Sequence, residues 1–383
     1  MPSAVIVGFK RSPFAIARKG NLANVRPEDI LSQVINDLVK STNINRDDIE
    51  DIIAGCAYPE GEQGFNIAKI VSFMTDMPEH VAGMTVNRWC GSSMQSIHIA
   101  AGAIAMNAGN AFICCGIESM SKVPINGLNY SPHSKLNESN PNVYLSMGNT
   151  AENVAKKYNL SREVQQDFSI SSHKKAFNAQ NQNYFNDELT SIHIDNIIIE
   201  LDEAIRPNTS QEILNWLKLV FDENGTVTAG TSSPLTDGAA ATLICNENYA
   251  KKNNLPILAK IISTAVNGCP PELMGLGPIG ASKKALKRAN LDIKDMDIIE
   301  LNEAFASQSL ACMKDLNIDP EKVNIDGGAI ALGHPLGATG TRITAKAAQI
   351  MQREKKQYAL ATQCIGLGPV SYTHLTLPTI YSV

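Results

Sequence analysis

Residues 90–116 read CGSSMQSIHIAAGAIAMNAGNAFICCG, and residues 333–366 read GHPLGATGTRITAKAAQIMQREKKQYALATQCIG. Each segment is a glycine-rich turn, followed by a helix of mostly small residues and then by an apolar strand. Two segments of one pattern, about 245 residues apart, indicate an internal repeat. They decide the fold because they relate one half of the chain to the other.

A second pair of segments keeps nearly the same offset. Residues 30–56 and residues 281–303 each contain a helix, an Asn-containing turn with acidic residues and a strand with the letters DII. Two matches in the same order predict duplicated halves that face each other across a pseudo-dyad. Cys90 and His334 then occupy equivalent positions at turns from a strand to a helix, and both point into one shared site.

The order of elements predicts an α/β fold. Short Val/Ile-rich segments alternate with helical segments, which is typical of a sheet buried on both faces. We expect an N-terminal half over residues 1–120, to which residues 243–265 return, and a C-terminal half over residues 266–383. Residues 121–242 are richer in Asn, Gln and charge, which predicts an inserted, more exposed domain lying over the substrate.

Composition excludes several classes of protein. With 44% hydrophobic and 19% charged residues, the chain is typical of a well-buried globular protein. The net charge of -5 and the lack of long basic runs argue against a nucleic-acid partner. The cysteines form no C-x-x-C pair and no Cys/His cluster, which predicts a reduced protein without a metal site. Neither a signal peptide nor a membrane span is expected, so we predict a cytoplasmic protein.

Cys90 lies at the start of the first small-residue helix. A helix N-terminus carries about half a positive charge and unpaired N–H groups, so we expect the pKa of this thiol to be lowered toward about 7. The alternative is a small buried apolar residue, the usual role of a lone cysteine. We interpret the neighbouring Trp89 as a packing residue.

Three further residues lie at turns where chemistry is expected. His334 sits in a glycine-rich turn, Asn302 follows a predicted strand, and Cys364 ends another strand. Ligands usually meet an α/β sheet at the carboxyl ends of its strands. With Cys90, these residues supply a nucleophile, a base and oxyanion donors. A structural role is the alternative for any histidine, and we assign it to the other six: His80, His98, His133, His173, His193 and His374.

The motifs of this chain resemble those of the thiolase family. In chain order they read VNRWCGSSMQSIHIAAGAI, SMGNTAENVAKKY, GTVTAGTSSPLTDGAAA, ELNEAFASQ, GGAIALGHPLGATGTR and CIGLG. The resemblance runs from the N-terminus to about Gly368, and it implies duplicated α/β/α/β/α layers with an inserted loop domain. The stretches EQGFNIAK and TSSPLTDG look most like the degradative 3-ketoacyl-CoA thiolases of fatty-acid β-oxidation.

The resemblance implies how five residues share the reaction. Cys90 would attack the 3-keto carbon of a 3-ketoacyl-CoA and hold the shortened chain as a thioester, with His334 activating it. Cys364 would protonate the departing acetyl-CoA carbanion and then deprotonate the incoming CoA thiol. One oxyanion hole would be formed by His334 with a water held by Asn302, and the other by the backbone N–H groups of Cys90 and Gly366. Two half-reactions predict ping-pong kinetics.

The resemblance also implies binding residues and partners. Ser233 matches a position that contacts the CoA pantetheine, and Met147 matches one that lines the acyl pocket. Coenzyme A would be a substrate, and no cofactor or metal is expected. We expect a homodimer or homotetramer, with a hydratase/dehydrogenase subunit of a β-oxidation complex as a further candidate partner.

The C-terminal segment departs from the family pattern. After CIGLG the family continues with more glycines and an apolar final strand, whereas this chain reads PVSYTHLTLPTIYSV. Pro369 and Pro378 fit a central strand poorly because proline lacks an N–H. We therefore expect the last 15 residues to be atypical, the placing of Cys364 and Gly366 to be affected, and the protein to be less stable than a complete family member.

Three other functions fit part of the pattern. A biosynthetic acetoacetyl-CoA thiolase would run the same chemistry toward condensation, but short-chain members carry His where this chain has Ser146. A thiolase-like lipid-binding protein without turnover would not need the four reactive side chains that this chain retains. A ketosynthase acting on carrier-protein substrates fits the CIGLG and NEAF elements badly.

Overall fold

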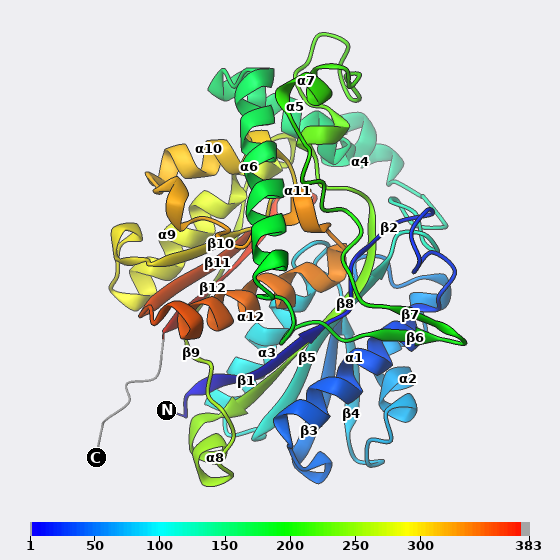
Figure 1. Ribbon diagram of the computed structural model, residues 1–383, viewed down its shortest axis with the longest axis vertical. Coiled ribbons are helices and arrows are strands. Elements are labelled where there is room, and N and C mark those ends of the chain that lie inside the picture. The colour runs from blue at the N-terminus through cyan, green and yellow to red at the C-terminus, as the bar shows by residue number, and fades with distance from the viewer. Residues whose placement is uncertain (1, 377–383) are drawn as a thin grey trace.

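The computed structural model describes residues 2–376, and within them ten strands form one mixed sheet (Figure 1). Nine strands follow the order β10-β11-β12-β9-β1-β8-β5-β3-β4, and β2 (Ala15–Ile16) pairs with β8. The strands of the N-terminal half are β1 (Ala4–Arg11), β3 (Ile49–Gly55), β4 (Ala82–Val86), β5 (Ala111–Ser119) and β8 (Thr236–Asn246). Those of the C-terminal half are β9 (Ala259–Gly268), β10 (Ile298–Leu301), β11 (Tyr358–Cys364) and β12 (Pro369–Thr376).

The two halves repeat one order of elements, so the predicted duplication is confirmed. The helices that take part are α1 (Pro27–Thr42), α3 (Ser92–Ala105), α9 (Gly277–Ala289) and α12 (Leu336–Glu354). The series β1-α1-β3-α3-β5-β8 corresponds in order to β9-α9-β10-α12-β11-β12. The halves join where β1 pairs antiparallel with β9 through Val5 and Ile6.

The central layer consists of α3 and α12, each of which contacts strands of both halves. On the outer faces, α1 covers the strands of the N-terminal half and α9 those of the C-terminal half. The short α2 (Ile67–Met74) lies beside the end strand β4. This gives the five α/β/α/β/α layers expected, with apolar clusters beneath α1, around the central helices and beneath α9.

Small residues allow the central helices to touch backbone to backbone. A Cβ atom on Gly340 of α12 would collide with the backbone nitrogen of Met94 in α3. At the same crossing, the Thr341 N–H donates to Ser93 Oγ at 2.9 Å. The small-residue character of both repeat segments is therefore explained by close helix packing, which carries the two turns at the helix starts toward each other.

The insertion between β5 and β8 contains α4 (Ser134–Ser139), α5 (Met147–Tyr158), α6 (Arg162–Asn181), α7 (Gln211–Asn215) and the hairpin β6 (Ile192–Ile194) and β7 (Ile197–Ile199). In Figure 1 its helices form the upper part of the molecule, whereas the hairpin lies lower, at the right of the view. Its helices pack on α10 (Ala306–Leu316) and α11 (Ala329–Leu332).

Strand pairing shifts the domain boundaries predicted from the sequence. β8 begins at Thr236, before the predicted end of the insertion at residue 242, and α8 (Glu247–Lys252) follows it. β9 pairs along its length with β12, whereas it meets β1 through only two residue pairs. Residues 243–265 therefore do not return to the N-terminal half as one piece, because β9 is built into the other half.

The final strand corrects the expectation drawn from the tail. Residues 369–376 form β12, a central strand that is antiparallel to both β11 and β9. Pro369 is its first residue, a position where a strand tolerates proline because one missing N–H costs a single ladder hydrogen bond. Leu375 and Thr373 are fully buried there. Pro378 lies outside the described residues.

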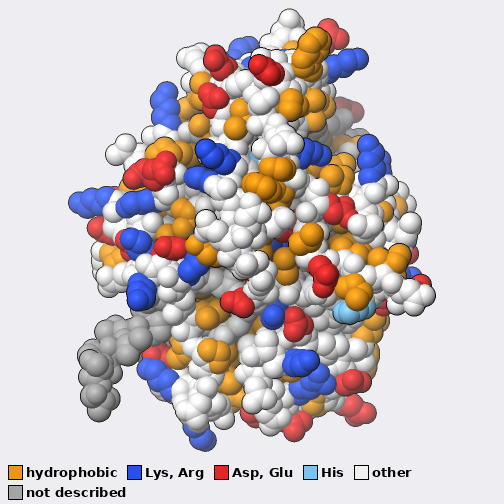
Figure 2. All heavy atoms as spheres, viewed as in Figure 1, with side chains coloured by type: hydrophobic (Ala, Val, Ile, Leu, Met, Phe, Trp, Pro, Cys, Tyr) orange, Lys and Arg blue, Asp and Glu red, His pale blue; other side chains and the backbone are white. Residues whose placement is uncertain are grey.

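The surface carries charges of both signs. Figure 2 shows basic and acidic side chains intermingled over the viewed face, without a large area of one sign. On this face the distribution agrees with the small net charge of -5. Among residues 2–376, no helix combines the length and the apolar character needed to cross a bilayer.

Candidate active site

Cys90 lies in a tight turn between β4 and α3. Trp89 has a φ of 47°, a left-handed conformation that strains a bulky side chain. The Ser92 hydroxyl holds this turn by donating to the Trp89 carbonyl at 2.6 Å and accepting from the Arg88 N–H at 2.9 Å. The Trp89 ring meets the Tyr58 ring edge-on at 5.1 Å, which confirms its packing role. The turn presents a buried thiol, 2% exposed.

The thiol of Cys90 is protonated in the free protein. Burial raises its pKa to about 12, although the backbone N–H groups of Gly366 and of Cys90 itself lower it. The predicted pKa near 7 is therefore wrong, because α3 begins only at Ser92 and desolvation outweighs the helix terminus. A neutral buried thiol becomes a nucleophile only if a base takes its proton during the attack.

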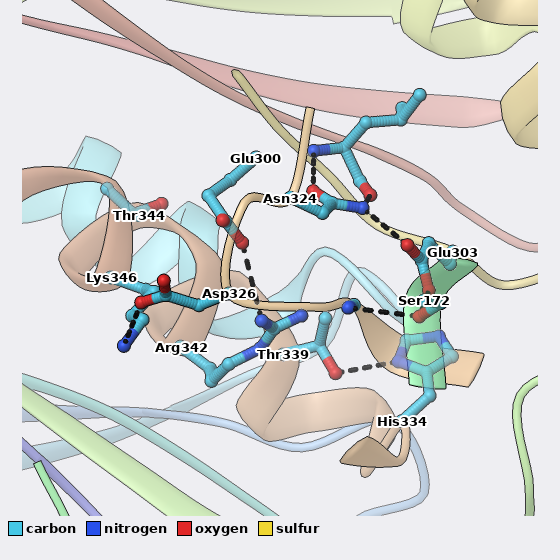
Figure 3. A network of polar contacts seen from close by, with 12 residues as sticks. Ser172, Glu300, Glu303, Asn324, Asp326, His334, Thr339, Arg342, Thr344 and Lys346 are labelled. Atoms are coloured by element: carbon cyan, nitrogen blue, oxygen red, sulfur yellow. Dashed lines mark hydrogen bonds and ion pairs between the residues drawn. The ribbon is translucent and has the colours of Figure 1, made fainter. Parts of the chain in front are cut away.

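His334 is a neutral base whose Nε2 carries no hydrogen. Figure 3 shows its ring directed at Thr339, with Nδ1 2.6 Å from the hydroxyl. The hydrogen on Nδ1 satisfies both contacts of the ring, because the Thr339 hydroxyl can then donate to the Pro335 carbonyl at 3.0 Å and Nε2 can accept from Asn302 Nδ2. Nε2 is then the acceptor, 3.3 Å from Asn302 Nδ2. Burial, followed by the nearby Arg342, lowers the pKa of His334 to about 3.

Asn302 follows β10 and lies beside the histidine. Its Oδ1 is buried and makes no hydrogen bond within residues 2–376. An acceptor without a donor, next to the unprotonated Nε2 of His334, can bind a small hydrogen-bonding group such as a water. The next residue, Glu303, accepts from Ser172 Oγ at 2.6 Å, from Asn324 Nδ2 at 2.8 Å and from the Ile330 N–H at 3.1 Å (Figure 3). These bonds hold the segment that leads to His334.

Cys364 ends β11 in an apolar environment. Its neighbours are Ala151, Val227, Met274, Ala304 and Phe305. Burial raises the pKa of Cys364 well above its usual range, and the thiol of Cys90 adds to the rise. The Gly366 N–H faces the sulfur of Cys90 from the same loop.

The two predicted binding residues lie on α5 and on the loop before β8. Met147, the first residue of α5, packs against the apolar cluster of Cys90 and also against that of Cys364. Ser233 donates its N–H and its hydroxyl to the Ala304 carbonyl, at 3.0 and 3.2 Å. Its side chain is half-buried and is anchored to the turn that follows Asn302.

The structure thus gathers the predicted residues from both halves and from the insertion. Two residues after His334, Leu336 packs in the apolar cluster that contains Cys90. Sequence reasoning missed Thr339, which lies five residues after His334 in the same repeat motif, and the restraining bonds of Glu303. A polar cavity of ≈ 320 Å³ lies elsewhere, at the end of α6, and includes none of the predicted residues.

These groups suit acyl transfer through a thioester. They comprise a buried thiol, a neutral imidazole with an unprotonated Nε2, backbone donors at the sulfur and a second thiol. The imidazole can accept the proton of the nucleophile, and the backbone N–H groups can stabilise a developing oxyanion.

Comparisons with known proteins agree along the whole length of the chain. The model for the thiolase N-terminal domain matches residues 4–248, and the model for the thiolase C-terminal domain matches residues 255–375. A 3-ketoacyl-CoA thiolase of Bacillus subtilis is 43% identical over 96% of this chain and 97% of its own length. One from Aliivibrio fischeri is 45% identical with the same coverage.

Solved structures give the same match. Human mitochondrial 3-ketoacyl-CoA thiolase in complex with CoA superposes with a TM-score of 0.91, at 35% identity and with 98% of each chain covered. The Bacillus anthracis acetyl-CoA acetyltransferase also reaches a TM-score of 0.91, at 32% identity, covering 98% of this chain and 99% of that one.

Proposed function

The chain belongs to the thiolase family, and on that premise we propose that it is a degradative 3-ketoacyl-CoA thiolase. It cleaves a 3-ketoacyl-CoA with CoA to give acetyl-CoA and an acyl-CoA that is two carbons shorter. The observation that carries the proposal is the pair of buried thiols: Cys90, with the Gly366 N–H at its sulfur, and Cys364, whose apolar cluster shares Met147 with that of Cys90. The names of the relatives support the substrate class.

The first half-reaction acylates Cys90. Its proton passes to Nε2 of His334 as the sulfur attacks the 3-keto carbon, and the N–H groups of Cys90 and Gly366 receive the oxyanion. The bond between C2 and C3 then breaks. The enolate of acetyl-CoA is stabilised at its thioester oxygen by His334 with a water on Asn302, and the Cys364 thiol protonates its carbon.

The second half-reaction releases the shortened chain. The Cys364 thiolate takes the proton of the incoming CoA thiol, whose sulfur attacks the thioester on Cys90. Collapse of the tetrahedral intermediate expels the Cys90 sulfur, which regains its proton from His334. One donor in such an oxyanion hole is worth about 3–4 kcal/mol, or about 10²–10³ in rate.

A chain-length series tests the function. CoA-dependent cleavage is measured on 3-ketoacyl-CoAs from about C4 to about C16, with Cys90→Ala as the inactive control. We expect turnover beyond C4, ping-pong kinetics, and an acyl adduct on Cys90 by mass spectrometry. Activity confined to C4 would favour the biosynthetic acetoacetyl-CoA thiolase instead. Absence of both turnover and adduct would favour a non-catalytic lipid-binding protein.

The apolar face around β4 supports a homodimer or homotetramer. β4 is the end strand of the sheet in the described part of the chain. Exposed apolar side chains gather on it and on the neighbouring α2 region: Phe65, Ile70, Phe73, Met74 and Met84. A second copy covering this face would shield an open strand edge that lies next to the Cys90 turn. Light scattering that shows a stable, active monomer would contradict this. A cytoplasmic location and a hydratase/dehydrogenase partner stay predictions.

A further inference from the structure

A buried carboxylate joins the two turns of the site. Glu118, near the end of β5, is fully buried. Its Oε2 accepts from the Ala57 N–H at 2.8 Å and from the Gly337 N–H at 2.8 Å. Its Oε1 accepts from the Tyr58 N–H at 3.1 Å and from Gln63 Nε2 at 3.1 Å. Four donors from three separate segments therefore converge on one side chain.

One of these segments carries His334. Gly337 is the second residue of α12 and lies three residues after His334, so its bond to Glu118 fixes the start of the helix on which the histidine turn rests. The start of α12 is packed too closely against its neighbours to shift. A Cβ on Gly337 would collide with the backbone of Gly55 and Ile117, at the ends of β3 and β5.

The other segment leads to Cys90. The Ala57 carbonyl accepts from Asn87 Nδ2 at 3.0 Å, and Asn87 Oδ1 in turn accepts from the Trp89 N–H at 2.9 Å. The Cys56 N–H also donates to the Val86 carbonyl at 3.1 Å, which ties the same segment to the end of β4. The segment after β3 is thus the support on which the nucleophile turn lies.

Both oxygens of Glu118 face hydrogen-bond donors. Burial raises the pKa of its carboxyl, and the N–H groups of Ala57, Gly337 and Tyr58 work against this rise without cancelling it. The Cys56 thiol, 3.7 Å from Oε1, is a further donor. A carboxylic acid would have to donate its own proton to an acceptor, whereas a carboxylate only accepts. The side chain therefore acts as an acceptor at both oxygens.

We propose that Glu118 is a positioning residue that locks the turn of Cys90 to the turn of His334 across the junction of the two halves. The proposal rests on the proposed function, because it assigns Glu118 a part in the proton transfer from Cys90 to His334.

The test replaces the carboxylate without changing its size. In Glu118→Gln the amide nitrogen meets N–H donors, so one pair of bonds is lost together with the charge. We expect kcat to fall by about 10- to 100-fold with KM within about twofold, because a small misplacement of reacting groups costs that much. Iodoacetamide alkylation of Cys90 at one pH, followed by mass spectrometry of its peptide, should be faster than in the wild type, because a turn that is no longer held exposes the buried thiol. Glu321→Gln, on an exposed side chain, is the matched control.

Glu118→Asp separates spacing from charge and serves if the glutamine variant does not fold. It keeps an acceptor at both oxygens but is one methylene shorter, so it cannot reach all four donors and kcat should fall here too. A folded variant of either kind with the kcat of the wild type would overturn the proposal, as would an unchanged alkylation rate in Glu118→Gln. The alkylation experiment needs no turnover, so its result is independent of whether the wild type cleaves 3-ketoacyl-CoA.

Discussion

At the scale of single residues, Thr339 decides which nitrogen of His334 is free to accept a proton. Its hydroxyl has one hydrogen, which it gives to the Pro335 carbonyl, so toward the imidazole it can only accept. A side chain that cannot accept would leave Nδ1–H buried and unpaired, and the other tautomer would compete.

Thr339→Val keeps the shape and removes the hydroxyl. We expect kcat to fall by about 10- to 100-fold, a part of the effect of a positioned general base, with KM within about twofold. Thr344→Val is the matched control, because Thr344 is equally buried on α12 but donates only to the Gly340 carbonyl. Steady-state kinetics of both variants check this, and equal losses in the two would show that Thr339 acts only on stability.

His173 makes the stability of the fold depend on pH. Burial, followed by Arg206, lowers its pKa to about 4, and its Nδ1 accepts from the Arg206 N–H at 3.2 Å. The unfolded chain binds a proton near pH 6.5 and the folded chain does not, so this contribution is complete above about pH 6.5 and is lost as the pH falls toward about 4. His334 acts in the same direction.

His173→Gln should remove the part of the stability loss at low pH that comes from this residue. Between about pH 7 and about pH 5, the group lowers the free energy of unfolding by about 2 kcal/mol in the wild type. Urea unfolding measures the difference in the free energy of unfolding between the two pH values. In the variant this difference should be smaller by that amount. Parallel pH dependence of the two proteins would contradict the assignment.

The reactive residues were predictable from the sequence, whereas their ionisation was not. Cys90 and His334 stand at equivalent places in the repeat, a pattern that sequence alone displays. The pKa of Cys90 depends instead on how completely the insertion and both halves exclude water, which is a tertiary property. The acceptor for Nδ1 of His334 was missed for a related reason, since a threonine in a helix gives no local signal of its partner.

At the scale of elements, the approach of α3 to α12 depends on glycine at the crossing. Gly340→Ala should destabilise the protein by about 1–3 kcal/mol or more, because the new methyl group meets the Met94 backbone, which cannot move aside. Gly102→Ala on α3 is the control, since nothing lies within 4 Å of its Cβ position. That change should stabilise the helix by about 0.5–1 kcal/mol. Denaturant unfolding of both variants measures the change in the free energy of unfolding, which should be negative for Gly340→Ala and positive for Gly102→Ala. Equal changes in the two variants would refute the packing argument.

The strands show where local patterns are insufficient. The segment 369–376 reads poorly as a central strand, yet it pairs with β11 on one side and β9 on the other. Fifteen residues of the two neighbouring strands pair with it, and this pairing outweighs its weak strand propensity. Likewise β9 joins the C-terminal half because β12 lies beside it, a choice that composition does not reveal.

At the scale of the whole molecule, a buried ion network joins the two halves to the insertion. Arg11 of β1 is fully buried and binds Glu188 at 2.6 Å and Asp202 at 2.7 Å. Lys346 of α12 binds the same Glu188 at 2.8 Å and also Asp326 at 2.9 Å, so each part of the chain contributes a charge. Such a network restrains the insertion over the site.

Arg11→Met should lower the free energy of unfolding by about 3–5 kcal/mol, because it leaves buried carboxylates without their cation. The comparison is Arg26→Met, where the side chain is 54% exposed and its pairing with Glu28 is worth about 0–1 kcal/mol. Urea unfolding of both proteins measures the difference. A change in Arg11→Met no larger than in Arg26→Met would mean that the network does not stabilise the fold.

The sequence by itself determined the duplication, the layered α/β class, the family and the identity of the reactive side chains, because each is carried by local pattern and its repetition at one offset. Tertiary structure alone decided the protonation of Cys90, the free nitrogen of His334, the strand formed by the tail and the carboxylate that links the two turns. The physical reason is that desolvation, hydrogen-bond pairing and strand partnership depend on groups brought together from distant parts of the chain, which no local pattern records.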